Sequence, residues 1–160
     1  MTGVPPEMQD DLDRIMRVME CAFLPHYGEA WNRRQVSDSL VLTSSRYCLI
    51  TPDGLFRPAD GEVTAGFTLS RGLFDEEELL LFAIAPAYRG QGLGRKLLCH
   101  CIEQARARGV RRMFLEMRKD NPAGALYASL GFRIVGVRPQ YYRLSGGERL
   151  DAISQELVLV

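Results

Sequence analysis

The sequence predicts a mixed α/β domain whose mostly antiparallel central sheet is flanked by helices. Alternating apolar residues over 63–69 indicate one of several antiparallel strands. The uninterrupted apolar run over 79–85 is typical of a strand that is buried on both faces in mid-sheet. A glycine-rich loop follows this run and leads into a helix over 92–108, whose apolar residues recur every 3.6 positions and which ends at Gly109.

The other elements follow in chain order. Helical spacing of apolar residues predicts a first helix over 7–22, and a second helix is predicted over 29–42 after Pro25 and Gly28 end the first. A short helix passes through Tyr127 and ends at Gly131. Further strands are predicted over 46–50, 111–117, 132–142 and 150–160. Because 160 residues suit one compact domain and no linker interrupts them, we expect a single domain over 1–160.

Composition excludes several classes of protein. Lysine and arginine (20) balance aspartate and glutamate (20), and the pI of about 6.7 leaves no general basic field for nucleic acid or an acidic membrane. The longest apolar run falls far short of the roughly 18 residues that span a bilayer, and the N-terminus has no basic start followed by an apolar signal region. We therefore expect a cytoplasmic protein with no nucleic-acid or membrane partner.

The four cysteines do not suggest a metal site. They form no CxxC pair, and Cys99 and Cys101 lie two apart in a predicted helix, so their side chains point to opposite sides. We expect no bound metal and no disulfide framework.

The segment 87–95 joins the buried strand to the start of a helix. Glycines let backbone N–H groups approach an anion closely, and the unpaired amides of a first helical turn carry partial positive charge. The loop therefore predicts a phosphate or diphosphate site. It is not a Walker A motif, because no Gly-Lys-Ser/Thr ends it. The alternative is a dinucleotide-binding fingerprint that begins at Gly90. Gly92 fits its second glycine and Glu116 fits the acidic residue expected further along the chain, but Arg95 stands where the fingerprint requires glycine or alanine.

A third pattern, Arg/Gln-x-x-Gly-x-Gly/Ala, is filled by Arg89, Gly92 and Gly94. This stretch resembles the acetyl-CoA-binding motif of the GNAT superfamily of N-acetyltransferases, and residues 125–132 (ALYASLGF) are similar to the family's second motif. Within the superfamily, 115–118 (LEMR), 138–142 and 151–153 resemble the bacterial ribosomal-protein-alanine N-acetyltransferase group. The chain departs from that group between Asn121 and Tyr127, where it is one residue shorter, and over its first 60 residues, which match loosely.

The resemblance implies a sheet that splays between the central strand and the strand after the CoA-binding helix. It implies a bulge near Ile84, where a backbone N–H would polarise the acetyl carbonyl and pantetheine would add to the strand edge. Acetyl-CoA would be the cofactor and CoA the product. The residues expected to bind it are Phe82, Ala83, Ile84, Arg89, Gly90, Gln91, Gly92, Leu93, Gly94, Arg95 and Asn121.

Acetyl transfer to an amine needs a base for the amine, a polarised carbonyl and a proton for the departing thiolate. Two glutamates compete for the role of base: Glu116, which matches the catalytic glutamate of the N-terminal acetyltransferases, and Glu78, which matches the base of histone-type members. The resemblance makes Tyr127 the general acid, and a phenol with a pKa near 10 is protonated at pH 7.

Tyr141 and Tyr142 resemble residues that line the peptide N-terminus, and we expect them in the loop between the last two strands. Alternation along an extended chain points the two rings to opposite faces, so one would touch substrate and the other would pack. Trp31 is the candidate for the opposite wall.

The expected activity is therefore acetyl-CoA-dependent N-acetylation of a free amine. The preferred substrate is a protein N-terminus, with a ribosomal protein as one candidate. An acetyltransferase for a small-molecule amine and a non-catalytic acyl-CoA- or dinucleotide-binding module stay as alternatives. The sequence leaves the oligomeric state open.

Overall fold

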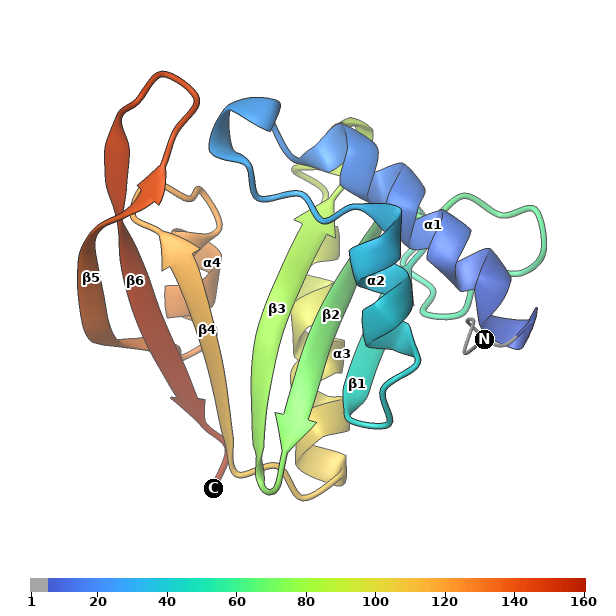
Figure 1. Cartoon of the computed structure of the whole chain (residues 1–160). Coiled ribbons are helices and arrows are strands. Elements are labelled where there is room, and N and C mark those ends of the chain that lie inside the picture. Colours follow the sequence, from blue (N-terminus) through green and yellow to red (C-terminus); the bar gives the residue numbers. More distant parts are fainter. Residues whose placement is uncertain (1–5) are drawn as a thin grey trace.

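The computed structural model describes the backbone of residues 6–160 and the side chains from residue 10 onward. Six strands form one sheet in the order β1-β2-β3-β4-β6-β5 (Figure 1). Every neighbouring pair is antiparallel except β3 and β4, which run parallel. The strands are β1 (Ser45–Ile50), β2 (Gly66–Leu73), β3 (Glu76–Ile84), β4 (Arg112–Arg118), β5 (Arg133–Arg143) and β6 (Arg149–Val158).

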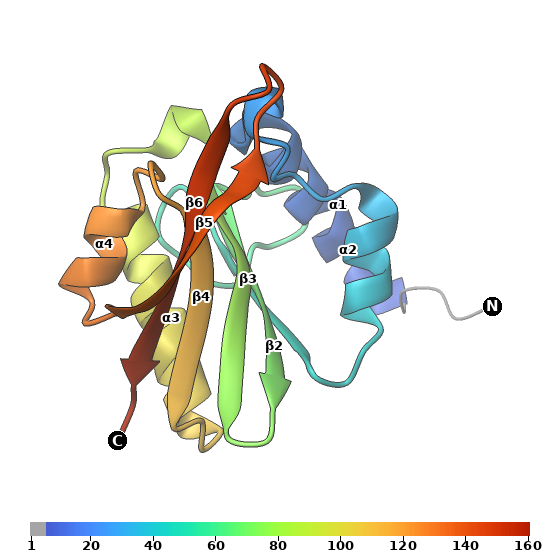
Figure 2. The ribbon, with the colours of Figure 1, turned by 60° about the vertical axis from the view of Figure 1, so that its left-hand side comes forward.

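Helices cover both faces of this sheet (Figure 2). One face carries α1 (Pro6–Ala22) and α2 (Arg33–Leu40), and the other carries α3 (Leu93–Ala107) and α4 (Gly124–Ser129). The core is divided accordingly, because apolar residues of α1 and α2 pack on one face of β1 to β3 while those of α3 pack on the opposite face of β1 to β4. The predicted fold class, a mostly antiparallel sheet flanked by helices, is confirmed.

The sheet splays between β3 and β4, as expected. The two strands pair only where Glu76–Leu79 lie beside Arg112–Leu115. Beyond Leu79, β3 continues with β2 as far as Ile84, and β4 continues with β6 as far as Arg118. The sheet therefore opens toward the carboxyl ends of β3 and β4.

The bulge in β3 lies at Leu80, so the expectation of a bulge near Ile84 is wrong by four residues. Leu69 of β2 pairs with Leu81 and Ser70 pairs with Leu79, which leaves Leu80 as the extra residue. Leu79 packs into the core on the α3 side, whereas Leu80 and Leu81 both pack on the α1 side. Because a bulge bends its strand, it lies where β3 begins to diverge from β4.

The second helix is shorter than its sequence pattern suggests. It begins at Arg33 because the Asn32 side chain accepts a hydrogen bond from the Gln35 N–H (2.9 Å), while the Gln35 side chain accepts one from the Asn32 N–H (2.8 Å). Glu29 and Trp31 consequently lie in the α1–α2 loop, residues 23–32. The α1–α2 loop reaches the hairpin between β5 and β6 (Figure 1), where the Ser145 N–H donates to the His26 carbonyl oxygen (3.1 Å).

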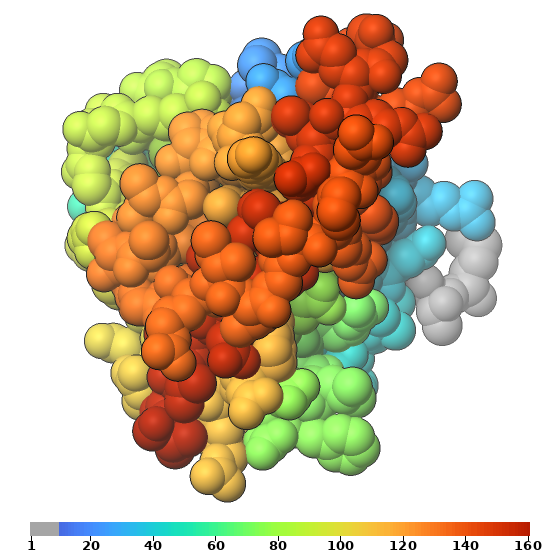
Figure 3. Space-filling model, turned by 90° about the vertical axis from the view of Figure 1, so that its left-hand side faces the viewer, coloured from blue at the N-terminus to red at the C-terminus, as the bar shows by residue number. Residues whose placement is uncertain are grey.

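Strand β5 forms one edge of the sheet. Figure 3 shows this side of the molecule, on which the C-terminal part of the chain, drawn in orange and red, forms most of the surface. Tyr141 and Tyr142 lie within β5 and not in the loop that follows, contrary to expectation. The strand extends this far because Tyr142 still pairs with Leu150 of β6.

Candidate active site

The loop before α3 requires glycine at two positions. A short 3-10 turn (Pro86–Tyr88) follows β3, and Gly90 and Gly92 then adopt φ values of 77° and 80°, which are strained for other residues. Gly92 is the N-cap residue of α3, which begins at Leu93. The free amides of the first turn of α3 therefore point out of the helix toward the loop, as an anion site requires.

Gly94 is needed for a different reason. A Cβ atom at this position would lie 3.2 Å from Cζ of Phe82 and 3.5 Å from Cδ2 of Leu126. Glycine therefore allows the first turn of α3 to lie close against β3 and α4.

These residues border a cavity of about 560 Å³, here called the loop cavity. All the predicted cofactor-binding residues line it except Gln91, which is exposed on the loop. Its lining residues from β3, the glycine loop and the turn after β4 include Phe82, Ala83, Ile84, Arg89, Gly90, Gly92, Leu93, Gly94, Arg95 and Asn121. Among the described strands, the edge of β3 that faces β4 is unpaired from Leu80 to Ile84.

The two arginines of the loop cavity already have protein partners. Arg89 donates from Nε to the Ile84 carbonyl oxygen and from Nη2 to the Ala22 carbonyl oxygen, both at 2.9 Å. Arg95 donates from Nη2 to Oγ of Ser129 at 2.6 Å. Arg89 thus joins the end of α1 to the end of β3, whereas Arg95 joins α3 to α4.

A second cavity of about 280 Å³, here called the strand cavity, lies in the opening between β3 and β4. It brings together four residues that the sequence predicted for catalysis or substrate binding: Trp31, Glu116, Tyr127 and Tyr142. The loop cavity and the strand cavity share Phe23, Glu29, Phe82 and Asn121, so the two spaces meet.

Glu116 projects from β4 on the face that carries α1 and α2. Its Oε2 atom accepts a hydrogen bond from Oγ of Ser154 (3.3 Å) and pairs with Nε of Arg138 (3.4 Å). Its side chain is 24% exposed. The carboxylate is therefore held by β5 and β6 while it remains in contact with solvent.

Tyr127 reaches the strand cavity from α4. Its ring packs edge-on against Phe82 and Phe132, and the residue is 5% exposed. Burial, with a smaller contribution from Glu29, raises the pKa of the Tyr127 phenol well above its usual value. The hydroxyl group is therefore protonated at neutral pH. Burial and the nearby Glu116 also raise the pKa of Tyr142, to about 12.

Besides Gln91, two predicted residues lie outside both cavities. Glu78 lies near the start of β3, where its carboxylate pairs with Nη2 of Arg71 (3.3 Å). Tyr141 is 53% exposed and lies against the Arg138 guanidinium, and its ring centre is 5.3 Å from that of Tyr142, so the two rings do not point to opposite faces as expected. Only Tyr142 of the tyrosine pair lines the strand cavity.

The sequence did not single out Glu29 or Arg118. Nη1 of Arg118 donates to Oε1 of Glu29 at 2.9 Å, and both side chains border the loop cavity. Arg118 was visible only as the last residue of the LEMR stretch, and Glu29 was expected at the start of a helix. No local pattern could have paired them, because 89 positions separate them in the chain.

The described residues contain no cluster of three or more His, Cys, Asp or Glu side chains that could hold a metal ion. None of the helices between residues 6 and 160 has both the length and the hydrophobicity that crossing a membrane requires.

Comparison with known proteins agrees with this geometry. Residues 12–132 match the model of the acetyltransferase (GNAT) family. Over 94 residues the chain is 44% identical to the ribosomal protein bS18-alanine N-acetyltransferase of Escherichia coli K12, and the aligned part covers 58% of this chain and 63% of that relative. The chain thus spans less than two thirds of the length of this relative.

Solved structures extend the likeness over more of the chain. The crystal structure of the ribosomal-protein-S18-alanine N-acetyltransferase from Escherichia coli has a TM-score of 0.78 and 31% identity, and the match covers 94% of this chain and 89% of that one. A Salmonella typhimurium protein that was solved with acetyl-CoA as its cofactor has a TM-score of 0.55 and 31% identity, over 61% of this chain and 60% of that one.

Proposed function

Because the chain belongs to the GNAT acetyltransferase family, we propose that it transfers an acetyl group from acetyl-CoA to a free amine, with CoA as the second product. The observation that carries this proposal is the meeting of the loop cavity and the strand cavity in the opening between β3 and β4. One space offers helix amides for a diphosphate, and the other offers a carboxylate and a protonated phenol for proton transfer.

The residues of the loop cavity fit acetyl-CoA. The loop after β3 and the first turn of α3 would hold the diphosphate, and the unpaired edge of β3 would hold the pantetheine arm as an added strand. Gly94 supports this fit, since a side chain there would enter the space between α3 and β3. Acetyl-CoA, when bound, supplies the acetyl thioester.

Glu116 would accept a proton from the substrate ammonium, and Tyr127 would donate one to the sulfur as the C–S bond breaks and the N–C bond forms. The substrate ammonium loses two protons in the reaction. One passes to solvent through Glu116, and the other returns to Tyr127 to replace the proton that Tyr127 gives to the CoA sulfur. Raising the pKa of Tyr127 by burial keeps it in the donating form at neutral pH. Glu78 is the weaker candidate for the base because it lies outside both cavities.

The preferred substrate in this proposal is a protein N-terminal α-amino group, with a ribosomal protein as one candidate. The similar proteins from Escherichia coli are named for the alanine of such a protein. An α-amino group has a pKa of about 7.7–8.0, so a carboxylate in contact with solvent suffices to deprotonate it. Trp31 and Tyr142 would line the first residue of the peptide. We further propose that the protein acts in the cytoplasm and that residues 1–160 form one domain.

Mass spectrometry of unblocked peptides incubated with acetyl-CoA tests the proposal. Wild-type protein should add one acetyl group at the α-amine, and Glu116→Gln should lower kcat at least ~100-fold, the usual contribution of a general base. Glu78→Gln is the matched control and should leave kcat within about twofold.

Three results would contradict the proposal. Turnover by Glu116→Gln at the wild-type rate would remove Glu116 as the base. Acetylation of small amines alone would exclude the protein substrate. Wild-type protein that binds acetyl-CoA without turnover would be a binding module.

A further inference from the structure

Glu29 lies where the loop cavity meets the strand cavity. It is the only ionisable residue among the four that line both, the others being Phe23, Phe82 and Asn121. Glu29 belongs to the α1–α2 loop. The contact between His26 of this loop and Ser145 of the β5–β6 hairpin holds the loop in place. A carboxylate is thus placed beside the point at which, on the proposed function, the acetyl group and the amine meet.

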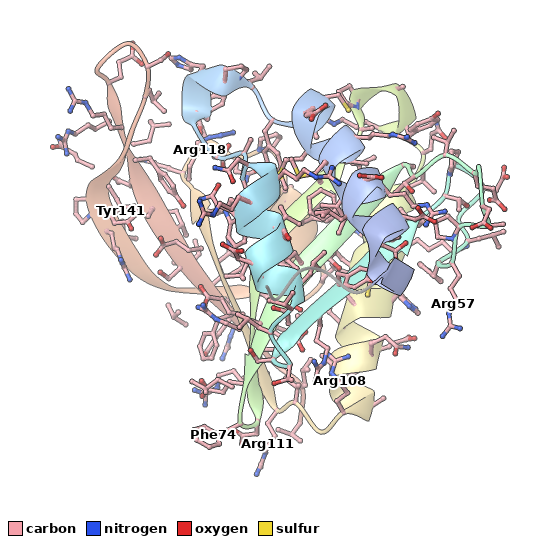
Figure 4. All side chains as sticks on the ribbon, turned by 45° about the vertical axis from the view of Figure 1, so that its right-hand side comes forward. Arg57, Phe74, Arg108, Arg111, Arg118 and Tyr141 are labelled. Carbon is pink, nitrogen blue, oxygen red and sulfur yellow. The ribbon has the colours of Figure 1, made fainter. Side chains whose placement is uncertain are left out.

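Arg118 fixes the position of this carboxylate. Its side chain is 7% exposed, and its guanidinium donates to Oε1 of Glu29 (2.9 Å) and to Oδ1 of Asp120 (2.8 Å). The guanidinium carbon also lies 3.5 Å from the centre of the Tyr27 ring. Figure 4 shows Arg118 close to the α1–α2 loop. Glu29, Asp120 and the Tyr27 ring therefore fix the Arg118 guanidinium, which in turn restricts rotation of the Glu29 side chain.

One oxygen of Glu29 remains available. Oε1 accepts from Arg118, and among the described side chains Oε2 has no hydrogen-bond donor. The Glu29 side chain is 20% exposed. Among the described residues, no protein donor would therefore have to leave Oε2 for an entering N–H group to bond to it.

The cluster of Glu29, Asp120 and Arg118 has two negative charges and one positive charge. Arg118 is shared between Glu29 and Asp120, so these three groups carry a net charge of −1. The only other carboxylate of the strand cavity, Glu116, has its own partner in Arg138. Glu29 also helps to raise the pKa values of the Tyr127 and Tyr142 phenols, which line the strand cavity with it. The two arginines of the loop cavity, Arg89 and Arg95, donate to other protein groups. A cation is thus the complement that this cluster lacks.

We propose that Glu29 binds the ammonium group of the incoming substrate through Oε2, and that Arg118 is the positioning residue that holds Glu29 in place. This assignment rests on the proposed function and deepens it. It divides the work between two carboxylates: Glu29 selects a cationic amine and holds it beside the thioester, and Glu116 then takes its proton. It also restricts the substrates to unblocked, protonated amines.

The state of Glu29 before substrate binds agrees with this role. Burial raises the pKa of its carboxyl group, Arg118 lowers it and Asp120 raises it again, with a net upward shift. A raised pKa in the folded state means that the ionised carboxylate stabilises the fold less than the protonated form does. Replacing Glu29 by a neutral isostere should therefore not lower the melting temperature.

The test compares Glu29→Gln with wild type and with Glu103→Gln, an exposed glutamate of α3 outside both cavities. Glu29→Gln should raise KM for an unblocked peptide roughly 10- to 100-fold, the loss expected for one charge-assisted hydrogen bond. The Kd for acetyl-CoA should stay within about twofold and the melting temperature should not fall. Glu29→Asp should recover part of the peptide affinity, and Glu103→Gln should match wild type.

Two further readouts separate substrate binding from a structural role. Wild-type KM should rise above pH ~8, where the α-amino group of the peptide loses its charge, and this rise should be absent in Glu29→Gln. By calorimetry in the presence of CoA, wild type should bind the peptide more tightly than a desamino analogue that lacks the amine. Glu29→Gln should bind the two equally.

An unchanged peptide KM in Glu29→Gln, with normal acetylation by wild type, overturns the assignment of Glu29 and leaves the proposed function intact. Parallel losses of acetyl-CoA affinity and melting temperature would show instead that Glu29 only holds the loop. A fall in kcat at constant KM would make it a base. Wild-type protein that acetylates no amine overturns the proposed function and this assignment together.

Discussion

Tyr127 packs against two aromatic rings and is also the proposed proton donor. Its ring contacts Phe82 of β3 and Phe132 after α4, so it links the two sides of the opening between β3 and β4. Tyr127 lines the strand cavity, and burial raises the pKa of its hydroxyl group, which is protonated at neutral pH. Packing and proton donation depend on different parts of the side chain and can be separated by one substitution.

Tyr127→Phe should lower kcat about 100-fold, because it removes the proton donor for the thiolate. The melting temperature should change little, because the phenyl ring keeps its contacts with Phe82 and Phe132. Steady-state kinetics with a peptide substrate and thermal unfolding measure the two effects. Full activity in a stable Tyr127→Phe protein would show that Tyr127 contributes to packing and is not the proton donor.

Residues far apart in the sequence were the hardest to foresee. Glu116 and Tyr127 were expected from motifs near them in the chain, and the structure places both at the strand cavity. Glu29 gave no such signal, because a charged residue in a loop has no periodicity. Its environment depends on Arg118, which reaches it from β4.

At the scale of elements, hydrogen bonds to backbone groups decide where segments end and meet. The expected second helix of 29–42 is reduced to Arg33–Leu40 by the reciprocal bonds of Asn32 and Gln35. This capping box is local and could have been recognised in the sequence. The contacts of Arg89 could not be read from its motif. The motif suggested that Arg89 binds acetyl-CoA, whereas its guanidinium donates to the Ile84 and Ala22 carbonyl oxygens.

Arg89→Ala should lower the free energy of unfolding by roughly 1–3 kcal/mol, because two carbonyl oxygens lose a charged donor. Arg95→Ala is the matched control, since the exposed Arg95 bonds only the Ser129 side chain, and it should cost no more than about 0.5 kcal/mol. Urea denaturation of both variants measures the difference. Equal stabilities would show that Arg89 does not hold α1 to β3.

At the scale of the whole molecule, the opening between β3 and β4 divides the sheet into two halves. One half contains β1, β2 and β3, and the other contains β4, β6 and β5. The two halves pair directly only over Glu76–Leu79 and Arg112–Leu115. A ligand that fills the opening should therefore stabilise the fold as well as the site.

Acetyl-CoA at about 100 times its Kd should stabilise the protein by about 2.7 kcal/mol, which corresponds to a rise in melting temperature of roughly 5–10 °C. Hydrogen exchange should show slower exchange of amides between Leu80 and Ile84, where β3 lacks a partner on the β4 side. NAD at the same concentration should produce no shift. Stabilisation by NAD and not by acetyl-CoA would favour the dinucleotide-binding alternative.

The sequence by itself determined the fold class, the family and the glycine loop that is proposed to hold the diphosphate. These depend on local patterns: the apolar run of β3, the period of α3 and glycines whose backbone geometry other residues do not readily adopt. The expected likeness to ribosomal-protein-alanine N-acetyltransferases is confirmed by the similar proteins.

Only the tertiary structure decided the position of the bulge, the exclusion of Glu78 from the two cavities and the pairing of Glu29 with Arg118. A bulge depends on the register between two strands, and the environment of a carboxylate depends on which segments the fold brings next to it. Burial and charge act through space, so the environment of Glu29 exists only where the fold brings the α1–α2 loop against Arg118 at the end of β4.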